Sequence, residues 1–472
     1  MTDPTIIAEL RGILGDSGLL IERADRAPYE TGARYDRGEA AFVARPKSTA
    51  EASRVVALCV RHGIALIPQS GNTGVVAGST PDASGTQAIL SLDRLTAPFE
   101  LDRVNRSVTA GAGLRLSELN SRLAADHLFF PIDLGADPRL GGMIATNTGG
   151  SRFLRYGDVR RNTLGLTVVL ADRDGTVLNL SSGLRKNNTG PDWKQLFIGT
   201  SGSFGVVTEC VLNLEPLPLQ TAAALLVPAS EQSVPELLVA MEQALGSYLS
   251  AFEGMSKNAM AAALAHAPSL RNPFAGGVIP DFAILAEVSR TWLPRNGEQP
   301  LSAVLEDVLA DLLDRPDPLL ADALVGRAEE MWALRHALSE GVRQSGKLIA
   351  FDLSFRRGDI MRFSTHMKAE MPKRFPGLTI CDFGHVGDGG VHFNLVVARS
   401  DPRAGDASFE QALRDWVFQV AVEDFGGSFS AEHAIGRRNQ GMYLRYTDAE
   451  LRRLAAAFKA STSPGPLGAV AL

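Results

Sequence analysis

Cysteine is scarce in this chain of 472 residues, which has Cys59, Cys210 and Cys381 and no others. Their odd number and wide separation exclude a disulfide framework and a CxxC metal site. We therefore expect a reducing compartment, of which a cytoplasmic location is the simplest case. The opening MTDPTIIAEL lacks a basic segment followed by an apolar core, so we expect no secretory signal peptide.

Long apolar runs and concentrated positive charge are missing as well. The uncharged run from Pro216 to Ser230 contains three prolines and is shorter than the about 20 apolar residues of a membrane-spanning helix. The 47 Lys and Arg residues against 53 Asp and Glu give a net charge of −6. Nucleic acids and anionic membranes require a concentrated basic surface, so we expect neither as a partner and no transmembrane segment.

Two common nucleotide-binding motifs are also absent. The best match to G-x-G-x-x-G is 111-GAGLRL-116, in which Leu116 occupies the third glycine position and would obstruct close packing of a helix. No G-x-x-x-x-G-K-[ST] motif occurs, so the phosphate-binding lysine of a P-loop is missing. A Rossmann site is disfavoured and a P-loop site is excluded.

Glycine is abundant, with 46 residues in the chain, and it is enriched in the blocks 69–81, 134–150 and 199–209. The first block follows a predicted buried strand at 64–68 and carries Gly71, Gly74 and Gly78. Glycines allow close backbone approach, so successive N–H groups there could converge on a pyrophosphate without a lysine. Taken alone, this block favours an ordinary surface turn over a phosphate site.

The organisation of the chain indicates two domains. Ser48 and Glu51 have the spacing of a capping box, which predicts a helix that ends near Gly63. After the Pro-rich stretch 216–220 the composition shifts to Ala- and Leu-rich segments. There we expect helices near 231–246, 301–314, 328–344 and 408–424, and strands near 281–288, 349–355, 378–383 and 391–397.

Two histidines lie in the segment 384-GHVGDGGVHFNL-395. A two-residue turn at Asp388-Gly389 would place His385 directly opposite His392, close enough for both imidazoles to bind one metal ion. Glu432 is the best source of a third ligand, and the adjacent His433 would then be a candidate general base. The alternative is a cross-strand histidine pair with a surface Glu-His dipeptide, and on the residues alone the two interpretations are close to even.

Arg335 lies in the predicted amphipathic helix around 331-MWALRHALSEG-341. A solvated or salt-bridged helix charge is the favoured interpretation from the sequence alone. The functional alternative is a bidentate contact with a substrate carboxylate, which suits a planar guanidinium group.

Taken together, five ordered motifs resemble the flavoproteins of the vanillyl-alcohol-oxidase and p-cresol-methylhydroxylase type. More narrowly, they are similar to the FAD-linked D-2-hydroxy-acid dehydrogenases, which include D-2-hydroxyglutarate and D-lactate dehydrogenases. The motifs are 68-PQSGNTG-74, 141-GGMIATNTGG-150 with 155-RYGDVR-160, 185-RKNNTGPDWKQLFIG-199, 384-GHVGDGGVHFN-394 and 430-SAEHAIG-436. The resemblance implies an α+β fold with a two-part FAD-binding domain at 1–215, an antiparallel-sheet substrate or cap domain at 216–425, and a C-terminal segment at 426–472 that returns to the FAD domain.

The resemblance also implies roles for individual residues. His385, His392 and Glu432 match metal ligands, for zinc or manganese, and His433 matches the catalytic base. Arg335, Ser339 and Asn394 match positions that contact the substrate. The residues implied for noncovalent FAD are Ser70, Gly71, Asn72, Thr73, Gly74, Gly78, Asp133, Gly142, Thr146, Asn147, Gly150, Gly157, Gly205 and Val207.

The implied reaction is the oxidation of a small D-2-hydroxy acid to its 2-oxo acid, with hydride transfer to the flavin. The electron acceptor would be an electron-transfer flavoprotein or a quinone, and a homodimer is one of the oligomeric states that the sequence allows. Two other functions stay open: a metal-dependent hydrolase, and a non-catalytic flavin carrier or electron-transfer subunit.

Some positions depart from the pattern of the hydroxyglutarate enzymes. Ala350 stands where they usually carry a lysine, so a distal substrate carboxylate would be held less well unless Lys347 substitutes. The common C-terminal Asn-Pro-Gly-Lys run is missing from 461-STSPGPLGAVAL-472.

Overall fold

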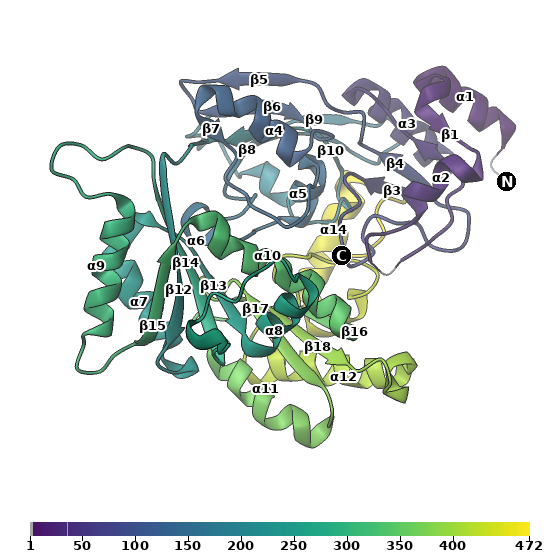
Figure 1. Cartoon of the computed structure of the whole chain (residues 1–472). Helices are drawn as coiled ribbons and strands as arrows, with labels where there is room; N and C mark the ends of the chain where they lie inside the picture. Colours follow the sequence, from purple (N-terminus) through teal and green to yellow (C-terminus); the bar gives the residue numbers. More distant parts are fainter. Residues whose placement is uncertain (1–2, 35) are drawn as a thin grey trace. The chain divides into compact units, whose positions relative to one another are not determined.

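The computed structural model describes residues 3–34 and 36–472, and the chain divides into two compact units (Figure 1). Unit 1 comprises Met1–Gly149, Gly157–Leu217 and Glu432–Leu472, and unit 2 comprises Gly150–Tyr156 and Pro218–Ala431. The short segment Gly150–Tyr156, which the sequence places in the first domain, therefore belongs to unit 2. Unit 2 also extends to Ala431, beyond the break expected at 425.

The first sheet of unit 1 has four strands in the order β1-β2-β4-β3. A core of apolar side chains joins this sheet to α1 (Pro4–Leu14) and α3 (Thr49–Arg61). The Ser48 side chain accepts a hydrogen bond from the Glu51 N–H, so the expected N-cap of α3 is present. The strands are β1 (Leu19–Leu20), β2 (Val43–Ala44), β3 (Leu66–Gln69) and β4 (Ala88–Ser91), and α2 spans Arg23–Glu30.

The second sheet of unit 1 is antiparallel, with the order β5-β6-β10-β8-β9. Its apolar side chains form a second core with α4 (Leu116–Leu123) and α5 (Leu140–Thr146). The C-terminal helix α14 (Ala449–Thr462) joins this core through Phe458, whose ring lies 5.1 Å from that of Phe204. The other elements are β5 (Phe99–Asp102), β6 (Ser107–Gly111), β7 (Leu128–Phe129), β8 (Thr163–Val169), β9 (Val177–Asn179), β10 (Val206–Asn213), β11 (Glu215–Pro216) and α13 (Gln440–Tyr446).

Unit 2 is built on a seven-stranded antiparallel sheet with the order β15-β12-β14-β13-β17-β18-β16. Helices α8 (Lys257–His266) and α10 (Ala328–Ser345) pack on one face of this sheet. The strands are β12 (Gln220–Pro228), β13 (Leu249–Ser256), β14 (Phe282–Arg290), β15 (Leu320–Gly326), β16 (Lys347–Ser354), β17 (Thr379–Gly384) and β18 (Gly390–Val397).

The opposite face of β16 and β18 packs against α11 (Ile360–Arg374) and α12 (Ala407–Gln419) through an aromatic cluster. Phe393 contacts Phe363 of α11, with ring centroids 5.3 Å apart, and Phe351 contacts Phe418 of α12 at 5.2 Å. Because side chains alternate along a strand, this packing leaves His392 and Asn394 on the other face. The remaining helices of the unit are α6 (Phe153–Tyr156), α7 (Val234–Leu245) and α9 (Leu301–Leu313).

Strands β12 and β13 were not expected from the sequence. The segment of β12 reads QTAAALLVP and is buried along most of its length, so it lacks the alternation that marks a half-exposed strand. The predicted helix at 408–424 also differs, because α12 ends at Gln419 and a π-helical turn spans Val420–Asp424. No helix within residues 3–34 and 36–472 combines the length and apolar character needed to cross a bilayer.

Candidate active site

The two-residue turn expected at Asp388-Gly389 is wrong. Strand β17 ends at Gly384 and β18 begins at Gly390, so the connection is a longer loop. The partner of His392 across the strands is Phe383 and not His385. The carbonyl of His385 accepts hydrogen bonds from the N–H groups of Asp388, Gly389 and Gly390, which close the loop around it.

Despite the different register, the two histidine rings remain neighbours. Their centroids lie 5.3 Å apart and their planes are inclined by 77°. The imidazole of His385 contacts a buried carboxylate of β13, with His385 Nδ1 2.7 Å from Glu253 Oε1. This contact leaves Nε2 of His385 as the ring nitrogen that Glu253 does not engage.

Arg335 is buried, with 8% of its surface exposed, and forms an ion pair with Glu253. Of the two forms of helix charge favoured from the sequence, the structure therefore shows the salt-bridged one and not the solvated one. Arg335 Nε donates to Glu253 Oε2 at 2.8 Å, and the guanidinium group lies over the ring of Phe383. Burial by itself would raise the pKa of Glu253, but the charges and hydrogen bonds of His385 and Arg335 lower it to about 2. Glu253 is thus held as a carboxylate between two cationic or potentially cationic groups.

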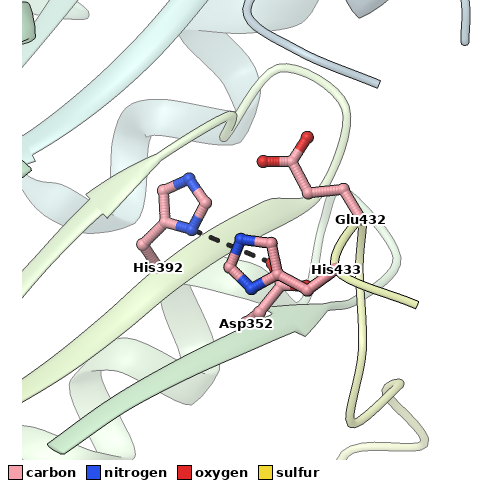
Figure 2. Close-up of side chains that lie close together, drawn as sticks. All are labelled: Asp352, His392, Glu432 and His433. Atoms are coloured by element: carbon pink, nitrogen blue, oxygen red, sulfur yellow. Dashed lines mark ion pairs between the residues drawn. The ribbon is translucent and has the colours of Figure 1, made fainter. Parts of the chain in front are cut away.

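Four side chains with metal-binding chemistry converge beside β18 (Figure 2). Asp352, His392, Glu432 and His433 each place one ligand atom within 4.8 Å of those of the other three. His385 is not one of these four, although its ring is adjacent to that of His392. Imidazole nitrogens and carboxylate oxygens are ligands of zinc and related divalent ions, so the donor set suits such an ion.

Asp352 is a member of this cluster that sequence reasoning missed. It lies directly opposite His392 in the pairing of β16 with β18, and its Oδ1 is 3.8 Å from His392 Nδ1. Its Oδ2 accepts a hydrogen bond from the Ala431 N–H at 3.0 Å, which positions the chain just before Glu432 and His433. Knowledge of the β16–β18 register was needed to find it, and the sequence offers no signal for that register.

The first glycine block forms an irregular loop directly after β3. Among the described residues, no protein acceptor receives a hydrogen bond from the backbone N–H groups of Gly71 to Gly74. The side chain of Asn72 braces the loop by donating to the Thr31 carbonyl and accepting from Ser79. Nothing lies within 4 Å of the position of a Cβ on Gly74. A braced, open row of amide donors fits the pyrophosphate of a dinucleotide.

The neighbouring segments of unit 1 pack closely around this loop. A Cβ on Gly142 would lie 3.3 Å from that of Ser70, so the start of α5 lies against the first glycine block. A Cβ on Gly78 would lie 3.5 Å from the carbonyl oxygen of Ile435, which belongs to the same 430–436 motif as His433. The glycine loop and the chain that follows His433 are therefore adjacent within unit 1.

Some residues implied for FAD have structural contacts of their own. Asn147 ends α5 in a left-handed conformation and binds the next loop, because its side chain accepts from Arg160 N–H and donates to Asp158. The side chain of Val207 is buried in the core of unit 1, so only its backbone could face a ligand. The other implied residues lie in loops or in α5: Thr73, Asp133, Gly142, Thr146, Gly150, Gly157 and Gly205.

The three residues implied for substrate binding differ in their surroundings. Asn394 is buried on the His392 side of β18 and donates to the His392 carbonyl, whereas Ser339 is exposed on α10 one turn after Arg335. Lys347 lies three residues before Ala350 on β16, so its side chain points to the opposite face of the sheet, where it forms an ion pair with Glu410 of α12. It therefore does not supply positive charge beside Ala350.

Comparison with known protein families identifies both parts of the chain. A model of the FAD binding domain matches residues 40–181, and a model of the C-terminal domain of FAD linked oxidases matches residues 217–465. The chain belongs to the FAD-linked oxidase family. The resemblance read from the five motifs is thereby confirmed.

Individual relatives of this FAD-linked oxidase extend over almost the whole chain. A probable mitochondrial D-2-hydroxyglutarate dehydrogenase of Oryza sativa subsp. japonica is 33% identical, over 98% of this chain and 80% of its own length. The mitochondrial D-2-hydroxyglutarate dehydrogenase of Rattus norvegicus is 33% identical, over 87% of this chain and 73% of its own length. A D-2-hydroxyglutarate–pyruvate transhydrogenase of Saccharomyces cerevisiae is 30% identical, over 95% of this chain and 90% of its own length.

Solved structures confirm the expected fold class. p-Cresol methylhydroxylase superposes with a TM-score of 0.73 at 17% identity, covering 98% of this chain and 94% of its own. Alkyldihydroxyacetonephosphate synthase gives a TM-score of 0.71 at 15% identity, and the match covers 99% of this chain and 84% of the synthase chain. The α+β fold with a p-cresol-methylhydroxylase-type FAD-binding domain and an antiparallel sheet is confirmed.

The cytoplasmic location expected from the cysteine content is wrong. The relatives from Oryza, Arabidopsis, rat and zebrafish are all named as mitochondrial enzymes. All three cysteines are free and buried in the structure. Free cysteines indicate a reducing compartment, but they do not show which reducing compartment it is.

Proposed function

We propose that this FAD-linked oxidase is a dehydrogenase that oxidises a D-2-hydroxy acid to the corresponding 2-oxo acid. The observation that carries the proposal is the convergence of Asp352, His392, Glu432 and His433 in a member of an FAD-dependent family. The names of the relatives from Oryza and rat support the substrate class, since both are D-2-hydroxyglutarate dehydrogenases.

FAD is the cofactor of the family, and the first glycine loop supplies a fitting site for its pyrophosphate. In this proposal the N–H groups of Gly71 to Gly74 hold the phosphate oxygens, and Gly142 allows α5 to approach. When bound, FAD supplies the acceptor for the hydride that leaves C2 of the substrate. Unit 1 then serves as the flavin-binding part, and unit 2 as the substrate or cap part.

The proposal also assigns a metal site and a catalytic base. His392 and Glu432 of the cluster, with the adjacent His385, would hold a divalent ion, zinc or manganese, and Asp352 orients His392 and the Ala431 backbone. Such an ion would act as a Lewis acid that lowers the pKa of the substrate C2 hydroxyl. A nitrogen of the His433 imidazole accepts the hydroxyl proton as the C2 hydride departs, so the two-electron oxidation leaves a carbonyl at C2.

Arg335 and Asn394 orient the substrate. The guanidinium group of Arg335 is fixed by Glu253 and Phe383, and a fixed guanidinium is suited to a planar carboxylate. Asn394 lies two residues from His392 on the same face of β18, where its amide can bind a substrate oxygen. Ser339, one helical turn beyond Arg335 on α10, is the third residue that we assign to substrate binding.

The electron acceptor is proposed to be an electron-transfer flavoprotein or a quinone. The yeast relative adds a further possibility, because as a transhydrogenase it is named for pyruvate as the second substrate. Reduced protein mixed anaerobically with each acceptor would identify the one that restores the oxidised flavin spectrum.

The test is an anaerobic titration of the purified flavoprotein with paired D and L forms of lactate, malate and 2-hydroxyglutarate. We expect one or more D acids to bleach the oxidised flavin absorbance and the matching L acids to leave it unchanged. Bound FAD that no acid reduces would refute the dehydrogenase and favour a flavin carrier. A metal-dependent hydrolase, for its part, gives no role to the glycine loop.

A further inference from the structure

Two buried carboxylates lie side by side on adjacent strands of unit 2. Glu253 of β13 and Glu287 of β14 are 0% and 2% exposed, and both point to the face of the sheet that α10 covers. Their partners differ. Glu287 accepts hydrogen bonds from the Trp332 indole and the Ser250 hydroxyl and pairs with Arg152, whereas Glu253 binds His385 and Arg335.

The two oxygens of Glu253 are divided between these two partners. Oε1 lies 2.7 Å from His385 Nδ1, and Oε2 lies 2.8 Å from both Nε and a terminal nitrogen of Arg335. Phe383 completes the arrangement, with its ring centroid 5.1 Å from the guanidinium carbon of Arg335. A single rigid carboxylate on a central strand therefore determines the direction of both side chains.

We propose that Glu253 is a positioning residue that couples the metal site to the substrate-carboxylate site. Its contact with Nδ1 would make Nε2 the nitrogen through which His385 binds the metal, and its contact with Arg335 would set the plane in which that guanidinium group meets the substrate carboxylate. The inference rests on the function proposed above, and it adds a residue that touches neither metal nor substrate.

A carboxylate is the group that this position requires. Carboxylate contacts to the second nitrogen of a metal-binding histidine fix its tautomer and ring orientation, and their loss typically lowers metal affinity by about 10- to 100-fold. Glutamine has nearly the same size, but an NH2 group that only donates replaces one of the two carboxylate oxygens, whereas His385 and Arg335 both need an acceptor. Glu253→Gln therefore leaves at least one of the two partners without its contact.

The experiment compares Glu253→Gln with Glu287→Gln in the FAD-loaded protein. The control removes an equally buried negative charge from the neighbouring strand of the same sheet, and it leaves His385 and Arg335 paired. Mn²⁺ affinity is measured by electron paramagnetic resonance titration of the metal-free protein, together with flavin content and thermal unfolding. KM and kcat are then measured with the D acid that best reduces the wild-type flavin.

We expect Glu253→Gln to keep its FAD, to weaken Mn²⁺ binding by about 10- to 100-fold and to raise KM by more than it lowers kcat. Glu287→Gln should lose thermal stability without loss of Mn²⁺ affinity. If Glu253→Gln does not fold, Glu253→Asp replaces it, since its shorter side chain keeps the charge but cannot reach both partners.

Wild-type Mn²⁺ affinity in the variant that folds would overturn the proposal, and so would an equal loss of Mn²⁺ affinity in Glu287→Gln. A wild-type protein that binds no Mn²⁺ would overturn it as well. Failure of the proposed function looks different, because Mn²⁺ binding would then depend on Glu253 while no D acid reduces the flavin.

Discussion

Gly389→Ala is the substitution whose cost the structure defines most directly. Gly389 has a φ of +96°, a conformation that costs a residue with a Cβ about 1–2 kcal/mol. The added Cβ would lie 2.2 Å from the carbonyl oxygen of Phe355, so this backbone must move by roughly 1 Å to reach ordinary contact. That movement strains the hydrogen bond from Phe355 N–H to the Gly389 carbonyl, worth about 1 kcal/mol.

The expected total is a loss of about 2–4 kcal/mol from the stability of unit 2. Thermal unfolding followed by circular dichroism should show a decrease in Tm of about 4–16 °C, at about 2–4 °C for each kcal/mol. The control is Gly358→Ala, because Gly358 has no positive φ and nothing within 4 Å of an added Cβ. A Tm equal to that of this control would refute the reasoning.

The substitution should also displace His385, because the N–H of Gly389 is one of three that bind the His385 carbonyl. We expect weaker Mn²⁺ binding in Gly389→Ala, measured below the unfolding temperature of the variant, and unchanged FAD content. Unchanged Mn²⁺ affinity in a destabilised variant would show that the loop geometry does not control the position of His385.

Three further predictions concern other residues. His433→Asn should retain FAD and slow anaerobic flavin reduction by about 10²- to 10⁴-fold in stopped-flow absorbance, since a positioned base contributes about that much; an unchanged rate would remove His433 from the mechanism. His392→Ala should lose Mn²⁺ binding while His366→Ala, which alters a histidine of α11 outside the cluster, should keep it; equal affinities would contradict the metal assignment. Burial opposes ionisation of Asp93, but the ion pair with Arg45 lowers the pKa of this carboxyl group below its unfolded value. The ionised Asp93 therefore stabilises the fold above about pH 4, and this stabilisation is lost as the pH falls through the folded pKa. Asp93→Asn should therefore be less stable than the wild type at pH 7, with a difference that narrows toward pH 3 in urea unfolding; a constant difference would contradict this assignment.

Local features of this chain could be predicted from the sequence because they depend on neighbouring residues. The N-cap of α3 needs only Ser48 and the N–H of Glu51. The loop after β3 could be predicted because its glycine content is high. The two faces of β18 follow from alternation, which distinguishes His392 and Asn394 from Val391, Phe393 and Leu395. The order of five motifs then identified the family.

The tertiary structure decided everything that depends on which distant segments meet. The register of β17 with β18 differs from the expected hairpin because a loop closed on the His385 carbonyl replaces the tight turn. Asp352 joins the cluster through strand pairing, and Glu253 meets His385 and Arg335 from a strand that was not expected. A buried carboxylate must find its partners across the fold because burial without them is costly, and the identity of those partners is a property of packing and not of sequence spacing.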